Sequence, residues 1–162
     1  MIRYFILLIF LCVALISFAG NEDRTGEAGA NELLINPWAR GSGMENANTA
    51  QVKGTEGLFS NVAGLTHVSK TELIFANTTW LKGSDIHINA FGISQRISES
   101  GVMALGVASM SFGDIPITTV NIPEGGIGTF SPNFMNINIA YAHAFSEQIS
   151  GGANVKIIYE SI

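Results

Sequence analysis

Three histidines, His67, His87 and His143, are the side chains of this sequence best suited to bind a metal or to act as a general base. They lie far apart and have none of the short spacings typical of zinc-binding motifs. His143 lies at the end of an apolar, alternating stretch, where we expect a side chain at an interface and not a metal ligand. The sequence therefore predicts no metal site and no cofactor.

Nucleophiles and phosphate-binding loops also lack their usual context. Serines are plentiful, but none lies in a nucleophile motif. Residues 41–46 begin like a dinucleotide fingerprint, but they lack its third glycine and follow no buried parallel strand. Residues 125–128 are glycine-rich and are expected to form an ordinary loop. We therefore predict that the protein is not an enzyme.

The first 19 residues are typical of a secretory signal peptide. Arg3 supplies the positive start, residues 4–18 form an apolar run broken only by Ser17, and Ala19 ends a stretch suited to cleavage. The run is shorter than the roughly 20 residues of a membrane helix. The sequence thus predicts export and cleavage after residue 19, with an uncleaved N-terminal anchor as the alternative.

Cysteine usage and charge exclude further classes. Cys12, the only cysteine, lies within the signal segment, and Leu11 before it does not fit a lipoprotein. The exported part would then have no disulfide. The chain has 8 Lys and Arg against 13 Asp and Glu, which argues against nucleic acid as a partner. Charged residues make up only 13% of the chain, and low charge without a helical span is typical of membrane proteins built from strands.

Two segments precede the strands. Residues 20–36 are expected to form a linker. Residues 37–70 are rich in Gly, Ala and Asn, and one or two helical turns are expected within 44–53 and 55–62, with Thr55 as N-cap. Because apolar residues are few in this segment, it must lie against another part of the protein.

From Thr71 onward the pattern changes to strands. The clearest is 134–146, in which apolar or aromatic residues alternate strictly with Asn and Ala. The last strand repeats this alternation, with Ile158 as an exception, whereas the second and third alternate poorly and their facing stays open. The expected strands are 71–81, 85–97, 102–112, 134–146 and 152–161.

Strand length and connections favour a membrane barrel. Strands of about ten residues match the 9–11 that cross a bilayer and exceed the usual 5–6. Tyr141, Tyr159 and Trp80 lie toward strand ends, as in an aromatic girdle. Short polar turns alternate with a long loop at 113–132, which is the asymmetry of outer-membrane barrels. We therefore predict an all-β fold over 71–162, an antiparallel up-and-down transmembrane β-barrel portion.

Five strands do not close a barrel, since the smallest membrane barrels have eight. We therefore expect this chain to be the N-terminal portion of a longer protein, truncated or split. The alternative is a barrel assembled from several chains.

Two motifs and one later element resemble the N-terminal region of the PorV/PorQ family, and the resemblance covers about residues 37–162. Val62 replaces the proline of the second motif, and Glu45 replaces the second glycine of the first, so a divergent paralogue is expected. The matching positions are Ala39, Arg40, Gly41 and Met44, then Asn61, Ala63, Gly64 and Leu65, and later Gly113, Asp114, Ile115 and Pro116.

This resemblance implies an outer-membrane, FadL-like barrel in which residues 37–70 form a plug-like segment. It further implies a scaffold for binding or transport, linked to type IX secretion components or to the C-terminal domains of secreted proteins. No catalytic residue is implied. Two alternatives stay open: a FadL-like channel for hydrophobic small molecules, and a soluble periplasmic β-domain. Polar residues such as Asn136, Asn154 and Lys156 predict a polar interior, which disfavours the channel.

Overall fold

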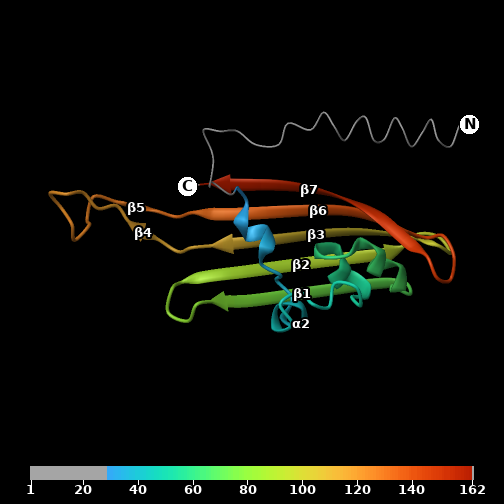
Figure 1. Cartoon of the computed structure of the whole chain (residues 1–162). Coiled ribbons are helices and arrows are strands. Elements are labelled where there is room, and N and C mark those ends of the chain that lie inside the picture. Colours follow the sequence, from blue (N-terminus) through green and yellow to red (C-terminus); the bar gives the residue numbers. More distant parts are fainter. Residues whose placement is uncertain (1–28, 162) are drawn as a thin grey trace, which may run out of the picture.

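One antiparallel sheet dominates the computed structural model, which describes residues 29–161. The predicted signal peptide at 1–19 and the first part of the predicted linker, 20–28, lie outside the described residues. The strands follow the order β1-β2-β3-β6-β7 in the sheet (Figure 1). They are β1 Thr71–Trp80, β2 Ile86–Arg96, β3 Gly101–Ser111, β6 Asn133–Ala144 and β7 Ser150–Ser161.

The sequence predicted each of these strands to within two residues, so the antiparallel β architecture is confirmed. Within the described residues the sheet is open, because β1 and β7 each pair on one side only.

The connections differ strongly in length. Short turns join β1 to β2, β2 to β3 and β6 to β7. The β2–β3 and β6–β7 turns lie at the same end of the sheet, which we call the turn end. The connection from β3 to β6 is long and projects beyond the other end, the loop end (Figure 1). It is a hairpin with a second, small sheet of β4 Ile115–Pro116 and β5 Thr129–Phe130.

Alternation of side chains along the strands gives the sheet two faces. In β1 the side chains alternate between exposed and half-buried over the whole strand. The register carries this alternation across the sheet, since Phe75 pairs with Phe91 on one face and Glu72 with Ser94 on the other. We call the face of Phe75 the outer face and the face of Glu72 the inner face. The facing of β2 and β3, which the sequence left open, follows from the same register.

The N-terminal segment, residues 29–70, lies across the inner face (Figure 1). A helix forms at the expected 55–62, as Gly54–Phe59, but in the expected 44–53 residues 44–51 form turns and no helix. Thr55 as N-cap is also wrong. Lys53 is the N-cap residue. Thr55 is the second residue of the helix, and its hydroxyl forms a hydrogen bond with the buried Ser94 on the sheet. The helices are η2 Asn31–Leu34, α2 Ala39–Gly43, η3 Gly54–Phe59 and η4 Val62–His67.

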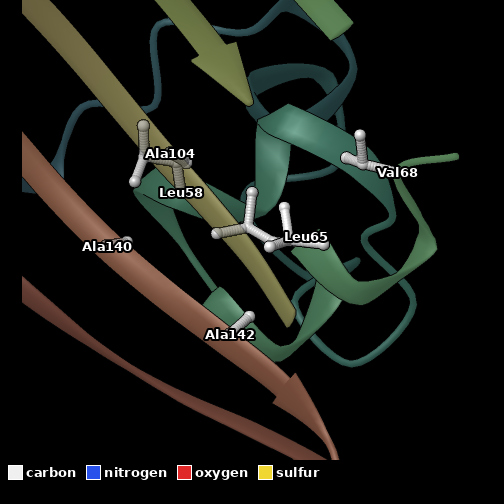
Figure 2. Packing of buried hydrophobic residues seen from close by; sticks show 7 residues of the cluster. Leu58, Leu65, Val68, Ala104, Ala140 and Ala142 are labelled. Carbon is white, nitrogen blue, oxygen red and sulfur yellow. The ribbon is translucent and has the colours of Figure 1, made fainter. Parts of the chain in front are cut away.

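The core lies between this segment and the turn end of the inner face. Leu58, Leu65 and Val68 from the segment are almost fully buried (Figure 2). They pack on small residues of the sheet, which let the short helices approach its backbone closely. Complete burial of such a side chain contributes about 1.5–3 kcal/mol. The sheet residues of this cluster are Val102, Ala104, Ala140 and Ala142.

Candidate functional site

The outer face carries two complete apolar rows that run across all five strands. In each row the residues are direct partners in the register, so their side chains are neighbours. Nothing within residues 29–161 covers these rows: Phe75 is 70% exposed and Val155 is 64% exposed. The rows are Leu73, Ile93, Leu105, Ile139 and Val155, and Phe75, Phe91, Val107, Ile137 and Ile157.

Charge is confined to the opposite face. All the charged side chains of the five strands lie on the inner face, and the outer face has no Asp, Glu, Lys or Arg. An exposed sheet face of a soluble protein is normally polar and charged. The charged residues are Glu72, Arg96, Lys156 and Glu160.

Aromatic side chains of the outer face gather at its turn end, and Tyr159 alone lies toward its loop end. Trp80, which the sequence predicts in an aromatic girdle, lies at an inner-face position of β1, so that prediction is wrong for Trp80. At the turn end the Tyr141 hydroxyl lies 3.1 Å from Nδ1 of His143, whose ring packs edge-on against Phe145 at 5.0 Å. Toward the loop end Tyr159 is directly opposite Met135 and largely exposed. Amphipathic aromatic rings at two levels are typical of the girdles of membrane strands.

Three polar contacts fasten η3 to the inner face. The Thr55 and Ser94 hydroxyls are 2.6 Å apart in a buried hydrogen bond. The Glu72 carboxylate accepts a hydrogen bond of 3.2 Å from the backbone N–H of Thr55. The Asn154 amide donates to the carbonyl of Leu58 at 3.0 Å and to Asn138 at 3.2 Å. These bonds hold the segment in one position, beyond what apolar packing alone specifies.

Arg96 fastens the other end of the segment. Its guanidinium donates to the carbonyls of Thr66 at 2.5 Å, Val68 at 2.8 Å and Glu99 at 2.8 Å. The first two carbonyls belong to the last turn of η4 and the residue after it, where helix carbonyls lack partners. The five-donor fork of arginine therefore ties η4 to the turn between β2 and β3.

Glycines on the inner face make room for these helices. A Cβ at Gly106 would lie 2.5 Å from Cδ2 of Leu58, and one at Gly152 would lie 2.7 Å from Cγ1 of Val62. Either contact is too short for real atoms. The inner face is therefore shaped for its own N-terminal segment.

A cavity of about 220 Å³ remains between the first part of the segment and the loop end of the inner face. Its lining is mainly apolar, with one acid, Glu32, and one cation, Lys156 from β7. This is large enough for a small organic molecule, since an engineered cavity of about 150 Å³ binds benzene. Its lining includes Leu33, Ile35, Phe59, Ile88, Met110 and Lys156.

The residues that carry the family resemblance fall into separate places. Leu65 is fully buried in the core, and Gly64 beside it abuts the backbone of Val52. Asn61 caps η4, because its side chain accepts a hydrogen bond from the backbone N–H of Ala63 at 3.2 Å and donates to the Thr49 carbonyl at 3.1 Å.

The first and last groups lie away from η4. Within α2, Gly41 is buried beside Asn36, while Ala39 and Arg40 are exposed, as is Met44 just after the helix.

The last group begins the long hairpin. Gly113 has a positive φ of 70°, Asp114 accepts a hydrogen bond of 2.5 Å from Ser131, and Ile115 and Pro116 form β4. The structure therefore brings only the group around Asn61 and Leu65 into the core.

Sequence reasoning missed the fastening residues Arg96, Glu72 and Ser94. One signal pointed to two of them, since Arg96 is the only charged residue of β2 and Glu72 the only one of β1, whereas nothing in the sequence distinguished Ser94. Among residues 29–161, no group of three or more His, Cys, Asp or Glu side chains is placed to hold a metal ion.

No helix in residues 29–161 has the length and apolar character needed to span a membrane. Comparisons with protein-family models, with curated proteins and with solved structures find no match.

Proposed function

We propose that this protein is part of an outer-membrane β-barrel and that its sheet faces lipid with its outer face. The observation that carries the proposal is the separation of charge, since every charged strand residue lies on the inner face. A lysine or arginine on the lipid face near the middle of a membrane barrel costs about 2–4 kcal/mol. Two uninterrupted apolar rows and aromatic residues at both ends fit the same environment.

The proposal requires further strands beside β1 and β7. A free strand edge in hydrocarbon leaves backbone groups without hydrogen bonds, at several kcal/mol each. We therefore propose that the five strands form one sector of a closed barrel. The N-terminal segment is then a plug-like element inside that barrel, held by Thr55, Asn154 and Arg96 against the inner face.

Within this class we propose a non-enzymatic scaffold of the PorV/PorQ type for binding or transport, with a role in type IX secretion. Its partners would be outer-membrane lipid and either secretion components or the C-terminal domains of secreted proteins. The motifs around Arg40, Asn61 and Asp114 support this family, and the predicted signal peptide supports export.

A FadL-like channel for hydrophobic small molecules is the second candidate. The cavity beneath residues 32–37 favours it, because the lining is mainly apolar. The polar inner-face residues Asn136, Asn138 and Asn154 favour the scaffold instead.

Alkaline extraction of outer membranes from the cells in which the protein occurs, where the strands that pair with β1 and β7 are present, tests the membrane proposal. We expect the protein to stay in the outer-membrane pellet after a carbonate wash. Release into the supernatant would contradict the proposal and favour a soluble periplasmic β-domain. Co-purification with type IX components, compared with uptake of a labelled fatty acid, separates the scaffold from the channel.

A further inference from the structure

The apolar part of the outer face changes in length across the sheet. We define the belt of a strand as its outer-face residues, glycine excepted, between the nearest polar residues, or the strand end, on either side. On β6 the belt runs between Asn133 and His143, and on β7 it fills the strand from Gly151 to Ser161. Four belt residues lie on each: Met135, Ile137, Ile139 and Tyr141 on β6, and Ala153, Val155, Ile157 and Tyr159 on β7.

The belt is shorter on the other side of the sheet. On β1 it comprises only Leu73 and Phe75, between Thr71 and Asn77. On β2 it likewise comprises two residues, Phe91 and Ile93, between Asn89 and Gln95, and on β3 it comprises Met103, Leu105 and Val107. The belt therefore shortens at both ends from β7 to β1.

The heights follow from strand geometry. At about 3.4 Å per residue and a tilt of about 40°, the ten-residue step from Gly151 to Ser161 rises about 26 Å along the membrane normal. This equals the apolar band of about 25 Å of outer-membrane barrels. The six-residue step from Thr71 to Asn77 rises only about 16 Å under the same assumptions. Strand tilt moves the belts of neighbouring strands up or down relative to one another along the membrane normal. Each belt height is measured along a single strand, so this shift leaves the difference in height between the β7 belt and the β1 belt unchanged.

The polar residues that limit the short belt are partnered across β1 and β2. The Asn77 amide donates to the Asn89 side chain at 2.7 Å, and the Thr71 hydroxyl donates to the Gln95 side chain at 2.5 Å. All four side chains are exposed. The Gln95 amide also donates to the Arg96 carbonyl at 3.0 Å. Since each side-chain amide has two N–H donors and a carbonyl with two lone pairs, each pair keeps further donors and acceptors for water or lipid headgroups. Polar groups therefore lie on the outer face of the β1–β2 hairpin both at Thr71 and Gln95 and at Asn77 and Asn89. These two levels limit the short belt.

We infer that the β1–β2 hairpin is matched to a thinner hydrocarbon layer than β6 and β7, and that the bilayer is thinned locally beside it. A surface shorter than the bilayer is accommodated by lipid thinning at a modest cost per ångström. The occupant of this surface is lipid with its headgroups drawn toward Thr71 and Asn77. The inference rests on the proposed membrane location.

Cysteine accessibility tests the inference on the full chain in outer membranes. In a Cys12→Ala background, single cysteines replace Thr71 and Asn77 on β1, or Met135 and Tyr141 on β6, which have the same six-residue spacing. Membranes opened on both sides are treated with a membrane-impermeant maleimide. We expect both β1 sites to react at least tenfold faster than both β6 sites. A uniform bilayer of about 25 Å must shield at least one site of each pair, because both pairs span only about 16 Å.

The outcomes separate the two proposals. If either β1 site is protected from the maleimide while both β6 sites are also protected, local thinning is contradicted and the membrane location still stands. A protein partner that covers β1 and β2 would give this result. Fast reaction at all four sites, with release by carbonate, overturns the membrane location itself. As a second measurement, the double variant N77L/N89L lengthens the belt. Its insertion should shift from dilauroyl toward dioleoyl phosphatidylcholine vesicles, and an unchanged preference contradicts the inference.

Discussion

Phe75 and Phe91 lie directly opposite each other on β1 and β2, on the outer face, with 70% and 43% of their surfaces exposed. Their row continues without a polar residue to Ile157 at the other edge of the sheet. Soluble monomers rarely expose so continuous an apolar surface. Whether lipid or water covers this row therefore determines how much a charged substitution on it destabilises the protein.

A lysine in the middle of the outer face should prevent stable insertion. Ile137 lies in the centre of the β6 belt, so Ile137→Lys should destabilise the inserted protein by about 2–4 kcal/mol. Urea unfolding of the vesicle-inserted protein measures this. The matched control is Val120→Lys, at a fully exposed position of the long hairpin, which should change the free energy of unfolding by less than about 0.5 kcal/mol. Equal, small effects at both positions would argue against a lipid-facing surface.

Loss of the Arg96 guanidinium should release the C-terminal end of the N-terminal segment. Arg96→Ala removes three hydrogen bonds and leaves the carbonyls of Thr66 and Val68 short of donors. We expect a loss of about 3–6 kcal/mol, at about 1.5–3 kcal/mol for each of the two part-buried bonds from this charged donor, whereas the exposed bond to Glu99 adds little. Limited proteolysis after residue 60 should become at least tenfold faster.

Two variants control for this result. Arg96→Lys should recover little, because an ammonium group cannot reproduce the planar fork. Arg40→Ala, at an exposed arginine of α2, should leave the proteolysis rate unchanged. Full recovery by lysine would show that charge alone, and not the fork, holds η4.

A methyl group at Gly106 should push η3 away from the sheet. Its Cβ would lie 2.5 Å from Leu58 and 3.0 Å from Phe59. Because Leu58 is buried in the core, overpacking should cost Gly106→Ala about 1–3 kcal/mol. Gly43→Ala is the control, since a Cβ there meets nothing within 4 Å. The double variant Gly106→Ala with Leu58→Val should lose less than the sum of the single variants, and strict additivity would contradict the proposed clash.

The outer face of β6 and β7 could be predicted from the sequence because alternation is strict in β6 and is broken only at Ile158 in β7. In β6, Ile137 and Ile139 alternate with Asn138 and Ala140, so one face is plainly apolar. The facing of β2 and β3 could not be predicted, because Gly92 and other small residues replace polar ones on the inner face. These small residues are required by the helices that pack on them, which is a tertiary cause that a single strand does not reveal.

The polar contacts of the inner face could not be predicted for a different reason. Thr55 and Ser94 are separated by 39 residues, and neither residue type is unusual in its place. The sequence suggested a local role for Thr55 as a helix cap, but the buried hydroxyl partner on β2 takes precedence. Non-local pairs of this kind become visible only once the segment is placed on the sheet.

The Thr55–Ser94 pair allows the docking of the segment to be measured directly. Both residues are fully buried, and their hydroxyls are 2.6 Å apart. Thr55→Val or Ser94→Ala alone leaves one buried hydroxyl without its partner and should cost about 1–3 kcal/mol. The double variant removes both hydroxyls, so it should cost clearly less than the sum of the single variants.

A double-mutant cycle in the free energy of urea unfolding gives the coupling, which we expect to be about 1 kcal/mol. Thr71 and Gln95 provide the matched comparison, because their 2.5 Å hydrogen bond joins exposed side chains and water can replace either partner in part. Their coupling should therefore be smaller. A coupling near zero for Thr55 and Ser94 would mean that this pair does not hold the segment, which would then depend on apolar packing and on the contacts of Glu72, Asn154 and Arg96.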